Sequence, residues 1–236
     1  TAQVMLRFEP VVVDYRPDWV IVVGDVNSTL ACSLVCSKVG VRLAHVEGGL
    51  RSFDRSMPEE INRMLTDQLA DLLFTPSEDG NQNLLREGIR LEKIHMVGNV
   101  MIDTLVRLLP LARARWPALQ SDLGLDRYIL VTLHRPSNVD DPATLVEILT
   151  ALGEVGREVQ VLFPVHPRTR RRIQEFKLVT KTRNVQLLEP FGYLDFLALQ
   201  AHAGLVITDS GVVQEETTYL GVPCLTLREN TERPVT

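Results

Sequence analysis

The sequence contains no apolar run of about eighteen residues, the length that a membrane-spanning helix requires. Its first residues also lack the basic start and small-residue cleavage site of a signal peptide. Three cysteines, an odd number, argue against a disulfide framework and fit a reducing cytoplasm. Cys32 and Cys36 have no neighbouring ligand residues, and we interpret them as small buried side chains. We therefore expect a cytoplasmic protein without a membrane segment or a bound metal.

The net charge is −5, and the sequence has no extended basic stripe. Positive charge is concentrated only at Arg168 and Arg170–Arg172, which begin a predicted helix after His166-Pro167. We interpret these arginines as a solvated helix face, with a phosphate contact from one of them as the alternative. The charge distribution gives no support for nucleic-acid binding.

Short apolar segments alternate regularly with segments of helical periodicity. Several apolar segments have no polar face, as in strands buried between two helix layers. Regular alternation predicts an α/β fold with parallel strands and right-handed crossovers. The predicted strands are residues 19–23, 41–44, 72–75, 94–97, 129–133, 159–164, 185–188, 205–208 and 224–227. The predicted helices are residues 1–15, 29–39, 59–69, 80–87, 100–111, 142–156 and 212–220.

The alternation is interrupted between residues 109 and 128. Pro110, Pro117 and the polar stretch 122–126 break the helical pattern before a second series of strands begins. We therefore predict two Rossmann-like domains, residues 1–110 and 127–236, whose strand ends face one cleft.

The first predicted domain opens on a helix instead of a strand, and no Gly-rich phosphate loop precedes Trp19. We therefore expect the chain to lack the opening strands of this domain, and also the closing helices of the second. Apolar surface should then be exposed near residues 19–23 and 41–44.

Ionisable residues follow the first two predicted strands. Asp25 should stand at a strand tip after Gly24, with a turn or capping role as the alternative. Glu47 lies in the segment His45-Val-Glu-Gly-Gly-Leu-Arg51, where the glycines allow a bulky ligand to approach the backbone. Arg51 is expected to hold Glu47 or a substrate oxygen, and a purely structural Glu47–Arg51 salt bridge is the alternative.

A helix is predicted to start at Pro58, with Glu59 and Glu60 in its first turn. Glu60 is interpreted as structural, facing solvent or a helix neighbour and contributing about 0.3–1 kcal/mol through the helix dipole. For Glu59, a structural and a catalytic role are equally supported.

Polar residues also follow strands of the second predicted domain. His134 is a candidate phosphate partner or general acid, with a satisfied loop histidine as the alternative. His166 is similarly placed and is balanced between ligand contact and support. A helix opening at Ser210 offers free amides to a diphosphate, unless Ser210 is only a helix cap. Glu216, in the second turn of that helix, is a candidate acceptor for ribose hydroxyls.

Five segments carry a resemblance to a known family. They are Gly24-Asp25-Val-Asn-Ser-Thr, residues 45–63, Val97-Gly98-Asn99-Val-Met-Ile-Asp103, residues 208–216, and Arg228-Glu-Asn-Thr-Glu-Arg233-Pro. In this order the chain resembles the bacterial non-hydrolysing UDP-N-acetylglucosamine 2-epimerases along its whole length. The resemblance implies a glycosyltransferase-B-like pair of domains, a homodimer, and an active site in the interdomain cleft. It also implies interconversion of UDP-GlcNAc and UDP-ManNAc without a nicotinamide cofactor, by elimination and re-addition of UDP through a 2-acetamidoglucal.

The resemblance also assigns roles to residues. By motif, the catalytic acids of the family correspond to Asp25, Glu47 and Glu59, and its catalytic histidine corresponds to His134. The candidate substrate-binding positions are Arg51, His166, Phe196 in the uracil segment, Ser210, Gly211, Val212 where the family has a second glycine, Glu216 and Arg233.

Three other functions are compatible with the same architecture and remain as alternatives. They are a UDP-sugar glycosyltransferase, a hydrolysing epimerase that releases ManNAc, and a nucleotide-sugar-binding fragment without turnover. The transferase would have less need for Asp25, Glu47 and Glu59.

Overall fold

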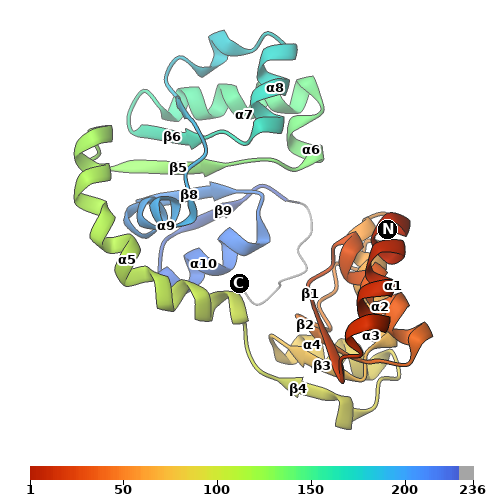
Figure 1. Ribbon diagram of the computed structural model, residues 1–236. Coiled ribbons are helices and arrows are strands. Elements are labelled where there is room, and N and C mark those ends of the chain that lie inside the picture. The colour runs from red at the N-terminus through yellow and green to blue at the C-terminus, as the bar shows by residue number, and fades with distance from the viewer. Residues whose placement is uncertain (229–236) are drawn as a thin grey trace. The chain divides into compact units, whose positions relative to one another are not determined.

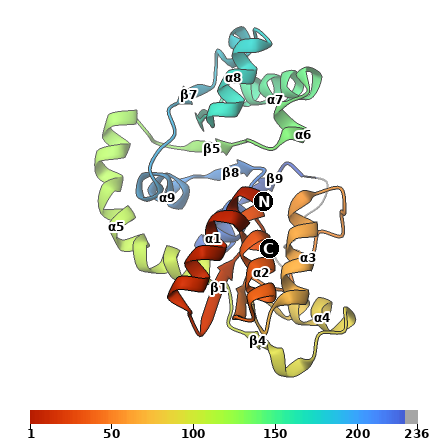
Figure 2. The ribbon, with the colours of Figure 1, turned by 45° about the vertical axis from the view of Figure 1, so that its right-hand side comes forward.

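The computed structural model describes residues 1–228, which form two compact units, each built on its own parallel sheet (Figures 1 and 2). Unit 1 is Thr1–Val100, and unit 2 begins at Met101. The predicted α/β class with two Rossmann-like units is confirmed. Within the described residues, all nine predicted strands are present to within two residues at each end.

Unit 1 has four parallel strands in the order β1-β2-β3-β4. Each strand is followed by a loop and a helix, so the polar segments after β1 and β2 lie at the carboxyl edge of one sheet. The strands are β1 (Trp19–Val23), β2 (Arg42–Val46), β3 (Leu72–Thr75) and β4 (Ile94–Met96). The helices are α1 (Ala2–Tyr15), α2 (Asn27–Val39), α3 (Pro58–Leu69), α4 (Glu78–Arg86) and the short η1 (Leu91–Lys93).

The predicted apolar exposure in unit 1 is found at β1 and not at β2. β1 is an edge strand, and its Ile21 and Val23 side chains are 64% and 54% exposed. Leu43 and Ala44 of β2 are buried, because β2 lies between β1 and β3. The expectation of exposure near residues 41–44 is therefore wrong. An interior strand is covered by a neighbouring strand on each side, so the loss of a strand beyond the sheet edge does not expose it.

Unit 2 has five parallel strands in the order β7-β6-β5-β8-β9. Apolar clusters that share the central strand β5 hold the sheet: Ile129 and Val131 point into one, Tyr128 and Leu130 into the other. The strands are β5 (Tyr128–Thr132), β6 (Gln160–Pro164), β7 (Gln186–Leu188), β8 (Leu205–Thr208) and β9 (Cys224–Thr226). The helices are α5 (Val100–Leu123), α6 (Pro136–Val139), α7 (Pro142–Val155), α8 (Pro167–Glu175), η2 (Val179–Thr182), α9 (Tyr193–His202) and α10 (Gly211–Leu220).

Helix α5 runs through the segment that the sequence suggested as an interruption. Pro110 and Pro117 lie inside this 24-residue helix, and both are exposed. The residues four positions before them, Val106 and Arg113, are exposed too, so water can satisfy the carbonyls that lose a helical hydrogen bond. The first unit consequently ends at Val100, ahead of the boundary expected at residue 110.

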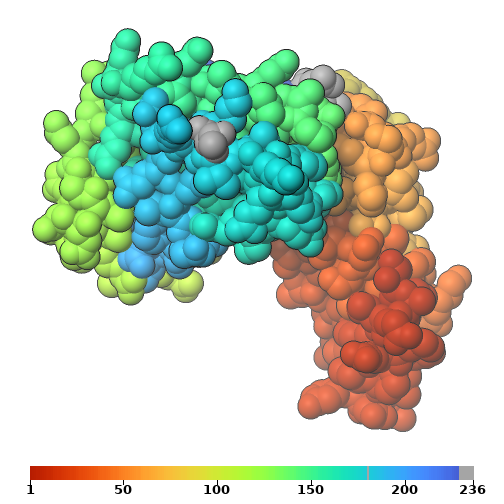
Figure 3. Space-filling view, turned by 90° about the horizontal axis from the view of Figure 1, so that it is seen from above, coloured from red at the N-terminus to blue at the C-terminus, as the bar shows by residue number. Residues whose placement is uncertain are grey.

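Helix α8 lies at the surface of unit 2 (Figure 3), and the side chains of its arginines are 28–65% exposed. Arg168 and Arg172 both bind the Asp140 carboxylate, and these hydrogen bonds lower the pKa of Asp140 to about 2. Two of the arginines are thus held by an acidic neighbour, as expected of a solvated helix face. Among the described residues, no helix combines the length and apolar character needed to cross a membrane.

Candidate active site

Asp25 lies directly beyond the tip of β1, where two residues of α3 hold it. The Arg63 guanidinium forms an ion pair with the Asp25 carboxylate, whose side chain is 33% exposed. The Asn62 amide donates to the Asp25 carbonyl oxygen at 2.8 Å and to Asn27 Oδ1 at 3.1 Å. The carboxylate is therefore oriented by a buried cation and still reaches solvent.

Glu47 lies in the turn after β2, with its backbone in the left-handed region at φ 69°. Few residues other than glycine adopt this conformation, and such strain is frequent at functional sites. Its carboxylate lies beside Gly24, because a Cβ added to Gly24 would come within 3.5 Å of Glu47 Oε2. The tips of β1 and β2 thus bring Asp25 and Glu47 to one edge of the sheet.

The same turn requires glycine at position 49. Gly49 has φ 82°, and an added Cβ would lie 2.4 Å from the Gly80 carbonyl oxygen. Gly49→Ala should lower the free energy of unfolding by about 2–4 kcal/mol, from the left-handed backbone and the clash together. Urea denaturation measures the loss.

Gly40→Ala provides the matched control. Gly40 has φ 75°, but no atom lies within 4 Å of the added Cβ. The Gly40→Ala substitution should lower the free energy of unfolding by only about 1–2 kcal/mol, the penalty of the left-handed backbone alone. Equal losses in the two variants would show that the close approach of the Gly49 and Gly80 backbones has no energetic weight.

Glu59 and Glu60 are both in the first turn of α3, but their environments differ. Glu59 is exposed and therefore accessible to a ligand. Glu60 is 1% exposed, and its carboxylate accepts hydrogen bonds from Ser52 N, Ser52 Oγ, Phe53 N and Arg63 Nη1 at 2.9–3.0 Å. Its structural role is as expected. Of the two expected orientations, solvent is wrong and a helix neighbour is confirmed, because Glu60 pairs with Arg63 one turn along α3. Its effect exceeds a helix-dipole effect, because Glu60 also ties the 52–53 loop to α3.

Arg51 is 3% exposed and pairs with carboxylates other than the expected Glu47. It forms a bidentate contact with Glu87 at 2.8 and 2.7 Å, and Nη2 lies 2.7 Å from Asp67 Oδ2. Burial alone would lower the pKa of Arg51, but the hydrogen bonds and charges of Glu87 and Asp67 raise it overall. Arg51 therefore links α3 to the end of α4, and its guanidinium is directed into unit 1. The sequence could not reveal this, because both partners are far away along the chain.

In unit 2, His134 lies beyond the tip of β5 and is held by Asp209, beyond the tip of β8. The buried Asp209 carboxylate accepts hydrogen bonds from His134 N at 2.9 Å, Arg135 N at 2.8 Å and Asn138 Nδ2 at 3.0 Å. Its Oδ1 also lies 2.9 Å from His134 Nδ1. Burial would raise the pKa of Asp209, but the hydrogen bonds from these three residues lower it overall.

This arrangement orients the imidazole of His134. Because a carboxylate accepts at Nδ1, that nitrogen carries a proton and Nε2 faces outward. The side chain is 42% exposed, so a ligand can reach it. The strand order reverses between β5 and β8, and such a switch point is where open parallel sheets bind ligands. Asp209 was not among the predicted site residues, although its place directly after a strand was a usable signal.

His166 lies close to His134, with 5.7 Å between the ring centroids. It is the N-cap residue of α8, and its Nδ1 accepts a hydrogen bond from Arg168 N at 3.2 Å. The proton of a neutral His166 is therefore on Nε2. The position supports both interpretations left open by the sequence, a ligand contact and support for His134.

Helix α10 begins at Gly211, beside His134 and Asp209. Ser210 is its N-cap residue but makes no side-chain capping hydrogen bond, which counts against a plain cap. Gly211 is buried, and Val212 is half-buried in the first turn. The first amides of α10 and the Ser210 hydroxyl form a group of donors suited to an anionic ligand.

Glu216 is 3% exposed and accepts a hydrogen bond from the Tyr193 hydroxyl at 2.7 Å. Burial raises the pKa of the Glu216 carboxyl. Phe196, on the same helix as Tyr193, is half-buried and packs against the apolar cluster that contains Tyr128. The predicted uracil contact Phe196 therefore lies on α9, and the predicted ribose contact Glu216 lies on α10. Arg233 lies outside the described residues.

The structure thus places Asp25, Glu47 and Glu59 at the carboxyl edge of the unit 1 sheet. Arg51 also belongs to unit 1 but is directed into its interior. The other described candidates lie in unit 2: His134, His166, Phe196, Ser210, Gly211, Val212 and Glu216. That both edges share one cleft stays a prediction. Among the described residues, no group of three or more His, Cys, Asp or Glu side chains is placed to hold a metal ion.

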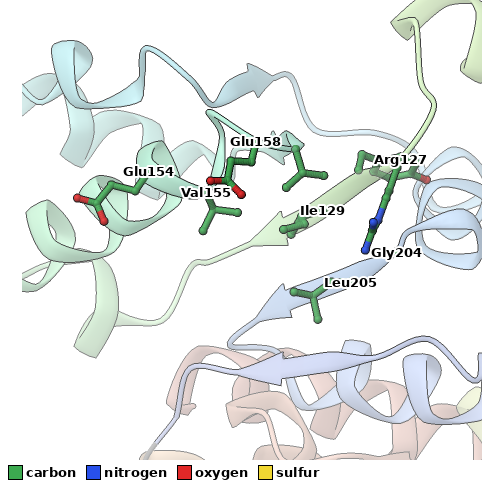
Figure 4. Close-up of a pocket in the computed structure, with 9 residues that line it drawn as sticks. Arg127, Ile129, Glu154, Val155, Glu158, Gly204 and Leu205 are labelled. Carbon is green, nitrogen blue, oxygen red and sulfur yellow. The ribbon is translucent and has the colours of Figure 1, made fainter.

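A hollow of about 520 Å³ is present at the opposite edge of the unit 2 sheet (Figure 4). It lies at the amino-terminal ends of β5 and β8 and is lined by Arg127, Ile129, Glu154, Glu158 and Leu205 among others. Ligands of open parallel sheets bind at the carboxyl edge, so this hollow is not the candidate site.

Comparison with known proteins assigns the whole chain to one group. A family model described as UDP-N-acetylglucosamine 2-epimerase matches residues 1–236. The chain is 46% identical over 247 residues to the UDP-N-acetylglucosamine 2-epimerase of Methanocaldococcus jannaschii, covering 100% of this chain and 67% of that protein. It is 45% identical over 238 residues to the UDP-2,3-diacetamido-2,3-dideoxy-D-glucuronate 2-epimerase of Pseudomonas aeruginosa, covering 98% and 64%.

A solved structure agrees with these relatives. The crystal structure of the Methanocaldococcus jannaschii UDP-GlcNAc 2-epimerase in complex with UDP-GlcNAc and UDP matches with a TM-score of 0.90 at 45% identity, covering 99% of this chain and 66% of that one. The chain therefore spans about two thirds of the length of the proteins that it matches.

Proposed function

The chain belongs to the UDP-N-acetylglucosamine 2-epimerase family, and from this premise we propose that it interconverts UDP-GlcNAc and UDP-ManNAc. The observation that carries the proposal is the pair formed by His134 and Asp209 at the switch point of unit 2. It presents an oriented imidazole beside the amides of α10, where a diphosphate can be held. The chain supplies, in unit 1, the carboxylates that a proton transfer at carbon needs.

The proposed reaction proceeds in two steps. A carboxylate removes the C2 proton, and the electron pair of the C2–H bond forms the C1=C2 double bond of 2-acetamidoglucal. The C1–O bond breaks at the same time, and UDP leaves with the electron pair of that bond. Protonation of C2 on the other face and re-addition of UDP at C1 then give the epimer. No external oxidant or reductant is required, because the atoms and electrons balance within the sugar nucleotide.

The residues divide between these tasks. Asp25, Glu47 and Glu59 exchange protons with the sugar, and Arg63 keeps the Asp25 carboxylate oriented. His134 stabilises the charge that develops on the departing diphosphate. The Ser210 hydroxyl and the Gly211 and Val212 amides bind that diphosphate. Glu216 and the Phe196 segment bind the nucleoside, while Arg233 and His166 contribute further contacts.

Incubation with UDP-GlcNAc in deuterated water tests the proposal. We expect UDP-ManNAc with deuterium at C2, because the proton taken from one face is replaced from solvent. Transfer of the sugar to an acceptor without deuterium at C2 would identify a glycosyltransferase. Free ManNAc with UDP would identify a hydrolysing epimerase, and UDP binding without any conversion would identify a binding fragment.

A second substrate has comparable support. The Pseudomonas aeruginosa relative, at 45% identity, is named for UDP-2,3-diacetamido-2,3-dideoxy-D-glucuronate. The same 2-epimerisation chemistry applies to both sugars, since each has an acetamido group at C2. A competition assay with the two sugar nucleotides decides between them through the ratio of their kcat/KM values.

We also infer a cytoplasmic homodimer from the family resemblance. Cys32, Cys36 and Cys224 are free thiols, which fits a reducing compartment. Sedimentation equilibrium should give about twice the mass of one chain. A single-chain mass across micromolar concentrations would overturn the dimer.

A further inference from the structure

A buried cluster of charged groups lies beneath the candidate site of unit 1, centred on Asp67 of α3. Asp67 and His45 are both fully buried. Asp67 Oδ1 lies 2.6 Å from His45 Nδ1, and its Oδ2 accepts from Gly49 N at 3.1 Å and from Arg51 at 2.7 Å. None of the roles proposed above uses His45 or Asp67.

The second ring nitrogen of His45 faces another acceptor. Nε2 lies 2.9 Å from the Gly24 carbonyl oxygen, which has no proton to donate. Nδ1 faces the Asp67 carboxylate. Both contacts are hydrogen bonds only if each nitrogen carries a proton, so the geometry calls for an imidazolium. The alternative is a protonated Asp67 that donates to Nδ1. It is disfavoured because Arg51 and Gly49 N both donate to the same carboxylate.

Charge balance supports the same assignment. The charged groups in this cluster are Asp67 from α3, Arg51 from the loop after β2, and Glu87 from the end of α4. Two carboxylates and one guanidinium leave one negative charge, and an imidazolium at His45 neutralises it. Glu87 is 26% exposed, whereas Asp67, Arg51 and His45 are buried, and neutrality of the whole cluster spares these buried groups the desolvation penalty of an uncompensated ion. Arg63, on the same helix as Asp67, is paired with Asp25 and Glu60 instead.

The cluster connects directly to two of the proposed catalytic acids. His45 binds the Gly24 carbonyl, one residue before Asp25, and Asp67 binds the Gly49 amide, two residues after Glu47. Gly24 and Glu47 both have left-handed backbones, at φ 67° and 69°. Two unusual turns at neighbouring strand tips are thus attached to one buried ion pair.

We propose that His45, as an imidazolium paired with Asp67, is a positioning residue that fixes the Asp25 and Glu47 carboxylates relative to each other. The kinetic part of this proposal rests on the proposed epimerase function. The pair touches no substrate itself. It acts by holding Gly24 and Gly49, and thereby the distance between two groups that must exchange protons with the same carbon.

Nitrogen-15 NMR of the labelled chain at neutral pH tests the charge state without any activity. We expect both ring nitrogens of His45 to show a directly bound proton, and His45→Gln assigns the signals by removing them. His95→Gln is the control, because His95 lies exposed on β4. A ring nitrogen of His45 without a proton would overturn the imidazolium, whether the chain is active or not.

Kinetics test the positioning role. Asp67→Asn keeps the shape of the side chain but removes the charge that pairs with His45. We expect kcat for C2 proton exchange to fall by about 10- to 100-fold, the scale of a small misplacement of reacting groups. The affinity for UDP, which binds unit 2 in the proposal, should stay within about twofold because the misplacement is confined to unit 1.

The outcomes separate the two proposals. If the unchanged chain exchanges no C2 proton from UDP-GlcNAc, the proposed function fails, and the NMR result still decides on the imidazolium. If the unchanged chain is active but Asp67→Asn has the same kcat, the positioning role is wrong. Should Asp67→Asn fail to fold, His45→Gln replaces it. Gln has no charge and carries both of its donors on one nitrogen, so it cannot span Asp67 and the Gly24 carbonyl as the two ring nitrogens do. It should therefore lower kcat in the same range.

Discussion

Replacing His134 by alanine should lower kcat by about two to four powers of ten, the usual effect of removing a positioned acid–base group. The expectation rests on the orientation of the ring. Asp209 Oδ1 accepts a hydrogen bond from His134 Nδ1 at 2.9 Å, and the side chain is 42% exposed. In the proposed reaction, Nε2 then faces the departing diphosphate. The measurement is the initial rate of UDP-ManNAc formation, together with a thermal melt that shows the variant is folded.

Two further variants test the geometry behind this expectation. Asp209→Asn should also lower kcat, because an amide presents a donor as well as an acceptor and no longer fixes the tautomer of His134. His202→Gln should leave kcat unchanged, because His202 stacks on Trp116 with ring centroids 4.1 Å apart and takes no part in the site. A His134→Ala variant with nearly full activity would exclude the proposed role of the imidazole.

The strands were predictable because a strand buried on both faces has a simple signature, a short apolar segment between two turns. The lengths of the helices were less predictable. α5 continues through Pro110 and Pro117 because both prolines are exposed, whereas an exposed and a buried proline look the same in a sequence. α9 was not predicted at all. Its residues 197–200 are buried in succession, which removes the alternation of apolar and polar faces on which the prediction depends.

The candidate site shows the same limit. The placement of polar residues at the strand tips was predictable because parallel strands bring their carboxyl ends to one edge, and that needs only the order of the elements. The partners of these residues were missed. Arg63, Asp67 and Asp209 contact residues 22–75 positions away, and a sequence does not specify which distant side chains meet. For that reason Arg51 was assigned to Glu47 or a substrate oxygen instead of Asp67 and Glu87, and the contacts of Glu60 with residues 52 and 53 were not expected.

Glu60→Ala should lower the free energy of unfolding by about 3–5 kcal/mol, the cost of breaking a buried ion pair by removing one partner. The substitution leaves the buried Arg63 without one of its two carboxylates and leaves Ser52 N and Phe53 N without their acceptor. Chemical denaturation of the chain measures the loss. Turnover should fall as well, because Arg63 also orients Asp25.

Glu59→Ala is the matched control, since it removes the same side chain one residue earlier in the same helical turn. Glu59 is exposed, so its loss should change the free energy of unfolding by less than about 1 kcal/mol, the size of a helix-dipole effect. As a proposed catalytic acid, however, it should lower kcat by about two powers of ten or more. The two adjacent glutamates are thus separated by stability: both substitutions should lower turnover, but only Glu60→Ala should also lower the free energy of unfolding by several kcal/mol. Equal stability losses would mean that the contacts of Glu60 with residues 52, 53 and 63 do not hold the loop. Unchanged turnover in Glu59→Ala would remove that carboxylate from the proposed reaction.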